Sequence, residues 1–246
     1  MYKEFFLTSV LIASMIIVLI SCNKDDNPLS GNATNGKTTA VFNSGITYGT
    51  LTDPDGNVYK TVTIATQTWM AENLRTTKYN DGTAIPNVTL ESAWKSLTTG
   101  AYCNFNNTNN TDTIATYGRL YNWYAVNTDR LAPKGWHVPT DAEWTTLTTY
   151  LGGASVAGGK LKEIGTTHWT TPNTDVTNET GFTALPGGCR SVNRSFIDIG
   201  GYGFWWSATE YGAYYAWYWY VSFDYSGVSR YSYNKEEGFS VRCVKD

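Results

Sequence analysis

The chain carries ten Trp, eighteen Tyr and nine Phe among 246 residues, of which only 16% are charged. Nearly all of these rings lie after about residue 45, in a stretch of about 200 residues that no second linker interrupts. A stretch of that length can bury a sizeable core as one domain. Because Tyr and Trp join a large apolar area to a polar tip, they are favoured where a surface must bind something. The composition therefore predicts one domain with an aromatic binding surface.

The N-terminus has the pattern of an export signal. Lys3 precedes an uncharged apolar run over residues 7–20, which is too short to span a membrane comfortably. The sequence Leu-Ile-Ser-Cys at residues 19–22 resembles a lipobox, in which a peptidase cuts before the cysteine and leaves it lipidated. We therefore predict a signal peptide over residues 1–21 and an effectively permanent acyl anchor on Cys22. The alternative is an ordinary secretory signal with an incidental cysteine.

Residues 23–26, Asn-Lys-Asp-Asp, resemble the acidic signal that sends lipoproteins of Bacteroidota to the outside of the outer membrane. The alternative is a solvated start to a linker. The following residues are rich in Gly, Ser, Thr and Asn and poor in large apolar side chains, which is typical of a flexible tether. We predict a tether over residues 22–44 and a domain over residues 45–246, anchored in the outer membrane and facing the cell exterior.

Charge and residue spacing exclude several classes of function. The net charge is −3 and Lys and Arg form no stripe, which argues against a nucleic acid partner. The histidines, His137 and His168, have no second-ligand pattern, and the cysteines have no CxxC spacing, so we predict no metal site. No nucleophile–base pair, carboxylate pair or phosphate loop stands out. We therefore predict a protein that is not an enzyme and that uses no cofactor.

Residues 53–57, Asp-Pro-Asp-Gly-Asn, lie between two β-rich runs at residues 46–48 and 58–64. An Asp-Gly pair between such runs indicates a hairpin turn. The alternative is a calcium loop with Asp53, Asp55 and Asn57 as ligands. The later glycine and glutamate of an EF-hand are missing, which favours the turn.

Two segments have helical patterns. Apolar and polar residues recur at i, i+3, i+4 and i+7 over residues 120–127, which predicts a buried amphipathic helix. Thr140 and Glu143 have the spacing of a capping box, so a second helix should begin there and end at Gly152-Gly153. Asp141 and Glu143 then have a structural role at the positive end of that helix. The Gly158-Gly159 pair is interpreted as a cap or turn.

After Gly165 the sequence predicts strands and loops. Residues 216–225 alternate, with Trp217, Trp219 and Val221 on a face that we expect to be core. The opposite face and its neighbours are rich in tyrosine, which predicts a ligand-binding set. This set comprises Tyr211, Tyr214, Tyr215, Tyr218, Tyr220, Tyr231 and Tyr233. The alternative is that these tyrosines are only good strand formers.

Several motifs follow one another in the order of a known family. They are Asp-Gly-Asn-Val-Tyr-Lys from residue 55, Gln-Thr-Trp-Met-Ala-Glu-Asn-Leu from 67, Tyr-Gly-Arg-Leu-Tyr-Asn-Trp from 117, Gly-Trp-His-Val-Pro-Thr-Asp-Ala-Glu-Trp from 135, Leu-Pro-Gly-Gly from 185, Trp-Trp-Ser-Ala-Thr-Glu from 205 and Gly-Phe-Ser-Val-Arg-Cys-Val-Lys-Asp from 238. From about residue 47 onward the chain thus resembles the Fibrobacter succinogenes major paralogous domain. That family resembles in turn the formylglycine-generating enzymes. The resemblance implies an α+β, C-type-lectin-like single domain with two main helices, short antiparallel strands and long loops.

The cysteines other than Cys22 are Cys103, Cys189 and Cys243. In a compartment that permits disulfides, one pair and one free thiol is the simplest arrangement. Many relatives have a cysteine where this chain has Ala132, and it is expected to bond the one in Val-Arg-Cys. This chain lacks that cysteine, so the resemblance implies that Cys243 bonds to Cys189 instead. Cys103 is the competing partner. The paired copper-binding cysteines of the formylglycine-generating enzymes are missing, so their activity is not implied.

These features together predict a surface-anchored lipoprotein that acts as a binding module for a glycan or a protein partner. The alternative is a structural or adhesive envelope component without a small ligand. A concave aromatic cleft would favour the first function and a flat patch the second. Separately, residues 112–114, Asp-Thr-Ile, resemble the O-glycosylation acceptor of Bacteroidota, which makes Thr113 a predicted glycosylation site.

Overall fold

The computed structural model describes residues 32–192 and 195–246. The predicted signal peptide and the lipidation site Cys22 lie outside the described residues. Among the helices of the described part of the chain, none has the length and apolar character needed to cross a membrane.

The strands and helices are short. The strands are β1 (Gly49–Thr52), β2 (Val58–Ile64), β3 (Gln67–Met70), β4 (Tyr102–Cys103), β5 (Leu120–Tyr121), β6 (Trp136–His137), β7 (Gly187–Arg190), β8 (Phe196–Ile199), β9 (Tyr202–Glu210), β10 (Tyr215–Ser222), β11 (Ser229–Asn234) and β12 (Val244–Lys245). The helices are α1 (Glu91–Trp94), the 3-10 helix η1 (Phe105–Asn107), α2 (Thr111–Tyr117), α3 (Trp123–Val126), α4 (Asp141–Tyr150) and α5 (Ala154–Leu161).

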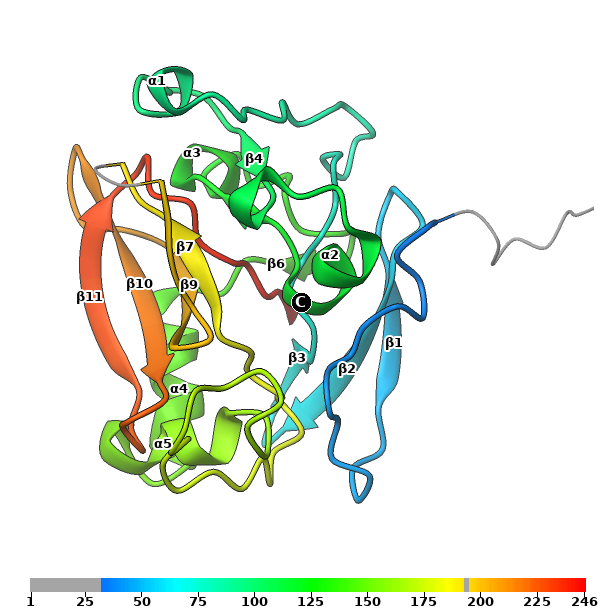
Figure 1. The fold of residues 1–246 in the computed structure, drawn as a ribbon, viewed down its shortest axis with the longest axis vertical. Coiled ribbons are helices and arrows are strands. Elements are labelled where there is room, and N and C mark those ends of the chain that lie inside the picture. The colour runs from blue at the N-terminus through cyan, green and yellow to red at the C-terminus, as the bar shows by residue number, and fades with distance from the viewer. Residues whose placement is uncertain (1–31, 193–194) are drawn as a thin grey trace, which may run out of the picture.

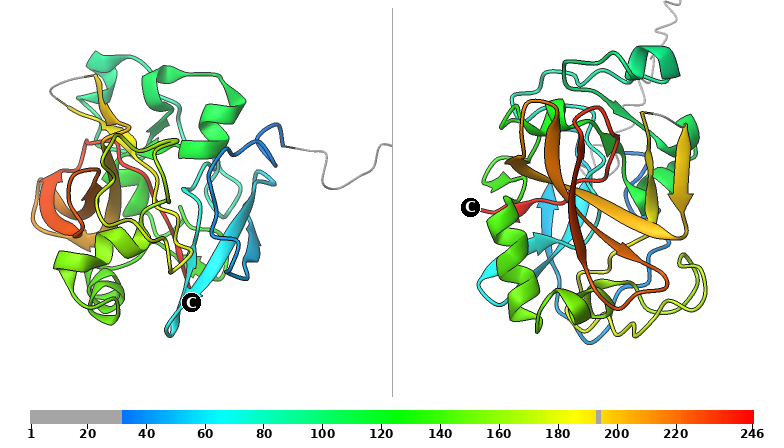
Figure 2. Two further views of the ribbon diagram at one scale, coloured as in Figure 1. Left: turned by 60° about the horizontal axis from the view of Figure 1, so that its bottom comes forward. Right: turned by 90° about the vertical axis from the view of Figure 1, so that its left-hand side faces the viewer.

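Two five-stranded sheets form the body of the domain. The first has the order β1-β2-β3-β12-β6 and the second the order β11-β10-β9-β7-β8. Figure 1 shows them on opposite sides of the molecule, with α1, α2 and α3 at one end and α4 and α5 at the other. The views in Figure 2 show the same separation of the helices. All pairings in the first sheet are antiparallel, whereas β7 and β9 in the second are parallel.

This architecture corrects the C-type-lectin-like α+β prediction. The structure is mostly β, with about 29% of its residues in strands and about 17% in helices, and its two main sheets curl into half-barrels. The longest helices, α4 and α5, have 10 and 8 residues. Strand pairing between distant segments, and not a pair of main helices, therefore determines this fold.

The helix predicted over residues 120–127 forms only in part, because the segment begins as a strand. Leu120–Tyr121 pairs with β4 as a strand, and the Tyr121 N–H donates to the Phe239 carbonyl. Asn122 keeps an extended backbone (φ −76°, ψ 161°), and its side chain accepts the Ala125 N–H. The helix therefore begins only after Asn122 and has four residues. Partners distant in sequence took the backbone hydrogen bonds that a longer helix would have needed.

Two local predictions are confirmed. The segment 53–57 joins β1 to β2 in an antiparallel hairpin, and Asp53 Oδ1 accepts the N–H groups of Asp55 and Asn57. The first strand of this hairpin is β1, however, and not the predicted run at residues 46–48. Thr140 and Glu143 form the predicted reciprocal capping box at the start of α4.

The Gly158-Gly159 pair is not a cap or turn, because both residues lie inside α5. A Cβ on Gly158 would lie 2.1 Å from the Gly227 carbonyl oxygen, and one on Gly159 would lie 2.3 Å from that of Asp175. These glycines therefore allow α5 to pack directly on the backbone at Gly227 and Asp175. The sequence pattern did not predict either contact.

The helix α4 and the C-terminal segment complete the core. Trp144 of α4 stacks on Trp219 with ring centroids 6.0 Å apart and also contacts Trp69 and Trp205, which covers one face of the second sheet. Residues 238–245 pass between the sheets (Figure 1) and exchange backbone hydrogen bonds with both of them. This path packs Phe239 against the face of β9 and β10 that α4 does not cover.

Residues 32–44 belong to the predicted tether, yet the structure shows them packed on the domain. The Thr34 hydroxyl donates to Asn57 Oδ1 and accepts from Arg75 Nε, at 2.9 and 3.0 Å. Farther along, the Val41 N–H donates to the Glu163 carboxylate. Residues 32–44 therefore pack as part of the domain.

Candidate functional site

Four of the seven predicted tyrosines come together on one face of the second sheet. Tyr218 and Tyr220 lie on β10, and Tyr231 and Tyr233 lie on the paired edge strand β11. The ring centroids of Tyr220 and Tyr231 are 6.1 Å apart, and those of Tyr218 and Tyr233 are 6.4 Å apart. These contacts make one continuous aromatic surface across two strands.

The neighbouring strand β9 adds two rings that the sequence analysis missed. Tyr202 and Phe204 stack with centroids 5.8 Å apart, and Phe204 lies 5.7 Å from Tyr220. The alternation of Tyr202, Phe204 and Trp206 in a predicted strand could have identified them. We call the following six rings the aromatic face: Tyr202, Phe204, Tyr218, Tyr220, Tyr231 and Tyr233.

The other three predicted tyrosines, Tyr211, Tyr214 and Tyr215, do not join this face. They lie at the connection between β9 and β10, where 56%, 74% and 44% of their surfaces are exposed. Tyr211 packs against Trp217, with ring centroids 4.7 Å apart. These residues form a separate exposed patch.

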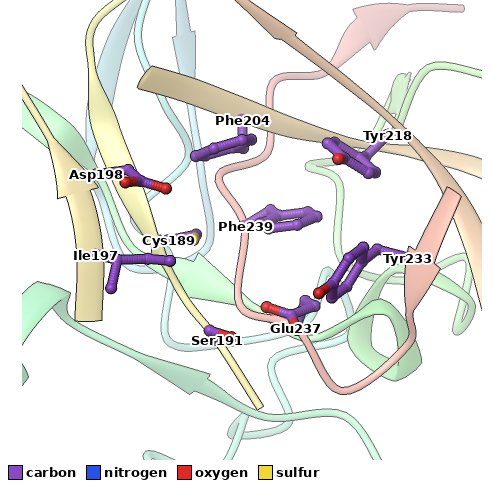
Figure 3. A pocket seen from close by; sticks show the side chains of 9 residues that line it. All are labelled: Cys189, Ser191, Ile197, Asp198, Phe204, Tyr218, Tyr233, Glu237 and Phe239. Atoms are coloured by element: carbon purple, nitrogen blue, oxygen red, sulfur yellow. The ribbon is translucent and has the colours of Figure 1, made fainter. Parts of the chain in front are cut away.

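One end of the aromatic face forms the wall of a pocket of about 190 Å³. Figure 3 shows its side chains arranged around Phe239, with contributions from β7 to β11 and from the C-terminal segment. The lining residues are Cys189, Ser191, Ile197, Asp198, Phe204, Tyr218, Tyr233, Glu237 and Phe239. The site is thus a hollow with aromatic walls and a few polar groups, which is the usual composition of a small-molecule site.

Glu237 is the most unusual polar group in this pocket. It is only 2% exposed, and its Oε1 accepts the Val192 N–H at 3.2 Å. Burial raises the pKa of this carboxyl group to about 7, and the nearby Glu236 charge adds to the increase, although the Val192 hydrogen bond opposes it. At neutral pH the protonated and ionised forms of Glu237 are therefore both populated.

Burial keeps two other groups of the wall, the Tyr218 hydroxyl and the Cys189 thiol, in their neutral forms. Burial raises the pKa of the Tyr218 hydroxyl well above its usual value, and the neighbouring Tyr220 and Tyr233 act in the same direction. Burial likewise raises the pKa of the Cys189 thiol far above its usual value. A thiol reacts as a nucleophile only when it is ionised, so Cys189 is a neutral part of the wall.

The predicted Cys189–Cys243 disulfide is absent. Cys103, Cys189 and Cys243, the cysteines of the described ranges, are buried free thiols. The pairing that the resemblance implied is wrong because the two cysteines belong to different sheets. Cys189 lies on β7 of the second sheet, whereas the Cys243 carbonyl accepts the Met70 N–H in the first sheet. The competing pairing with Cys103 is absent as well.

Residues 32–192 and 195–246 contain no group of three or more His, Cys, Asp and Glu side chains that could hold a metal ion. His137 instead bridges Glu143 and Asp246, with both distances 2.7 Å. Thr113, the predicted glycosylation site, lies in α2, and its hydroxyl donates to the Asn110 side chain at 3.2 Å. Its glycosylation stays a prediction.

The pocket and the two curled sheets define a β-rich domain with an aromatic site. A sequence model of the Fibrobacter succinogenes major domain matches residues 62–245, so the chain belongs to this family. The predicted family resemblance is confirmed, and the match includes the whole aromatic face and every residue that lines the pocket. No curated protein and no solved structure matches the chain. Membership of this family is consistent with a cell-surface protein.

Proposed function

We propose that the protein is a non-catalytic binding module of the cell surface and that its pocket holds a sugar unit of a glycan. The observation that carries this proposal is the concave site with rings from β9, β10 and the edge strand β11. A sugar presents C–H groups on its ring faces and hydroxyl groups at its edge. Aromatic walls can pack against the C–H groups. The polar groups of Tyr218, Tyr233 and Glu237 can form hydrogen bonds with the hydroxyl groups.

The composition of the described pocket lining suits binding better than catalysis. The Cys189 thiol stays protonated because it is buried. No histidine is among the described residues that line the pocket.

The exposed patch of Tyr211, Tyr214 and Tyr215 favours a second candidate function, which is contact with a protein of the cell envelope. These residues lie outside the pocket and are among the most exposed large apolar side chains of the described ranges. Exposed tyrosines of this kind are enriched at protein interfaces. This patch would serve an adhesive or structural role without any small ligand.

The sugar site is tested by binding of the full chain to a broad glycan panel, with and without EDTA. We expect saturable binding that falls at least about tenfold in Tyr233→Ala, which removes a wall of the pocket, because loss of a contacting ring costs about 1–3 kcal/mol. Tyr214→Ala, in the exposed patch, is the matched control and should bind normally. Binding that Tyr214→Ala abolishes and Tyr233→Ala leaves intact would move the site to the patch.

We also propose that an acylated Cys22 holds the domain at the outer membrane and that the domain faces the exterior. The short apolar run and the Leu-Ile-Ser-Cys sequence support the anchor. Replacing Cys22 by Ala should move the protein from the membrane fraction to the soluble fraction. Protease added to intact cells should cleave the wild-type protein, whereas full protection would place it on the inner side of the membrane.

A further inference from the structure

We propose, on the basis of the proposed glycan-binding function, that the glycan occupies two adjacent subsites and is therefore bound as an extended chain. The first subsite is the pocket. The second consists of three tyrosines of the aromatic face that do not line the pocket, which we call the outer row: Tyr202, Tyr220 and Tyr231. The spacing, exposure and hydroxyl groups of the outer row support a second subsite.

The outer row continues the ring pattern of the pocket wall along the strands. Each of its tyrosines lies two residues from a ring that lines the pocket, on the same strand: Tyr202 from Phe204, Tyr220 from Tyr218 and Tyr231 from Tyr233. Ring centroids are 5.8 Å apart in the first of these pairs and 6.0 Å apart in the second. Because residues two apart on a strand point to the same face, the outer row begins where the pocket ends.

The three tyrosines also contact one another across the strands. The ring centroid of Tyr220, on β10, lies 6.1 Å from that of Tyr202 on β9 and 6.1 Å from that of Tyr231 on β11. The outer row therefore extends over three neighbouring strands, and a ligand above it can contact more than one ring.

The outer row is more open than the pocket wall. Phe239 packs against the wall, with ring centroids 5.3 Å from Phe204 and 4.9 Å from Tyr218. In the outer row, Tyr231 is 58% exposed, and Tyr202 and Tyr220 are half-buried. Contiguous exposed rings of this kind mark a binding surface, whereas single exposed rings do not.

The hydroxyl groups of the outer row are available to a ligand. Among the described residues, none of these three hydroxyl groups has a hydrogen-bond partner, and none is buried without one. A tyrosine hydroxyl can donate and accept hydrogen bonds. Rings with free hydroxyl groups match a sugar chain, which presents C–H groups and hydroxyl groups along its whole length. A lipid chain would cover the same hydroxyl groups without bonding to them.

The distance between the two subsites fits neighbouring units of one chain. Residues i and i+2 of a strand are about 7 Å apart, which is comparable with the length of one sugar unit in an extended chain. When one unit lies in the pocket against Tyr218, the next unit therefore lies over Tyr220. The chain then runs along β10, and units beyond the second or third contact no ring of the aromatic face.

The test measures affinity against chain length by calorimetric titration of the full chain. The probes are ladders of one to six units of β-1,4-linked glucose, mannose and N-acetylglucosamine, together with a ladder of the glycan that binds most tightly in the panel. We expect affinity to rise at least about tenfold from one unit to three, which corresponds to about 1.4 kcal/mol. It should change little from three units to six, because the further units reach no ring.

Each other result has a definite meaning. Equal affinity for one and three units would overturn the second subsite and leave the sugar site in the pocket standing. A rise that continues steadily to six units would require a longer surface than the outer row and would also overturn it. Binding of no ladder, together with a negative glycan panel, would overturn the proposed function itself.

Variants separate the two subsites. Tyr231→Ala removes the most exposed ring of the outer row, so it should lower affinity for three units at least about tenfold and change affinity for one unit little. Tyr231→Phe keeps the ring and removes the hydroxyl group, so its loss should be smaller. Tyr233→Ala, in the pocket wall, should lower affinity for both lengths by the same factor.

Tyr150→Ala is the matched control, because Tyr150 is 63% exposed and lies on α4, away from the aromatic face. It should bind every length normally. Equal losses for one and three units in Tyr231→Ala would show that Tyr231 only supports the pocket. Unchanged binding of every length would favour a protein partner on the outer row. Either result would overturn the second subsite.

Discussion

Glu237 lies in an environment that disfavours the ionised form of its carboxyl group. Its carboxyl group is almost completely buried among aromatic side chains, although a glutamate in that position is more stable when it is protonated. A glutamine could accept the same Val192 N–H without the cost of burying a charge. Residues that lower stability in this way are often kept because a binding site needs them. The destabilising burial of the Glu237 carboxyl group is therefore what a role in the pocket would require.

The first prediction concerns stability against pH. The pKa of Glu237 is about 7 in the folded protein and 4.5 in its ordinary state. A raised folded pKa means that its contribution to stability is fully present below about pH 4.5 and is lost as the pH rises through about 7. The free energy of unfolding should therefore fall by up to about 3 kcal/mol over this range. Urea denaturation of Glu237→Gln at about pH 5 and about pH 8 should show a smaller decrease than the wild type, and parallel decreases would contradict this account.

Residue-level predictions from the sequence succeeded where the controlling contacts are local. Asp53 and Thr140 each bond to backbone groups within four residues, so the hairpin turn and the capping box could be recognised from spacing alone. Glu237 gave no such signal. Its burial depends on β7, β8 and β10, which are brought to it only by the complete fold.

At the scale of secondary structure, α5 depends on glycines that face other segments. The Gly158 Cα lies against the turn before β11, where a Cβ would meet the Gly227 carbonyl oxygen at 2.1 Å. Ser226 and Ala154 add backbone hydrogen bonds across the same contact, to Gly159 and Val228 respectively. Gly158 and Gly159 therefore determine how closely α5 approaches the second sheet.

The second prediction tests this contact. Gly158→Ala would ordinarily stabilise a helix, because alanine has the higher helix propensity. Here the added methyl group meets a backbone carbonyl that cannot move aside, and we expect a net destabilisation of about 1–3 kcal/mol. Gly212→Ala, where a Cβ would meet no atom within 4 Å, is the control and should change stability by less than about 0.5 kcal/mol. A more stable Gly158→Ala protein would show that α5 can shift away from the turn.

The prediction of helices and strands also succeeded where local contacts decide the structure and failed where distant contacts do. The run at residues 58–64 became β2 with the predicted bounds, and the alternating segment near residue 216 became β10. The periodic segment near residue 120 failed because β4 and the Phe239 backbone compete for its hydrogen bonds. A period of 3.6 describes which side chains are apolar, and it does not show which backbone partner is available.

At the scale of the whole molecule, the C-terminal segment joins the two sheets. It pairs with β3 and β6 through β12, and the buried Arg242 donates to the Phe182 and Thr183 carbonyls. No local pattern indicates such a connection, which explains why the sequence predicted the cysteine pairing incorrectly. The family motifs identified the chain, but the arrangement of its sheets required the structure.

The N-terminal segment is the other long-range connection, and it lies before the residues that the family model matches. Thr34 and Asn35 contact the guanidinium of Arg75, which is itself almost fully buried and paired with Glu72. If the chain began at residue 45, some Arg75 N–H groups would lose their acceptors in a buried position. Unpaired buried donors of this kind cost about 1–3 kcal/mol.

The last prediction follows from these contacts. A chain of residues 32–246 should unfold at a higher temperature than one of residues 45–246, by several degrees for a difference of about 1–3 kcal/mol. Thr34→Val in the longer chain removes the hydroxyl that accepts from Arg75 Nε, so its midpoint should lie between the two. Differential scanning calorimetry measures all three. Identical midpoints would show that residues 32–44 add nothing to the domain and act only as the tether that their composition predicts.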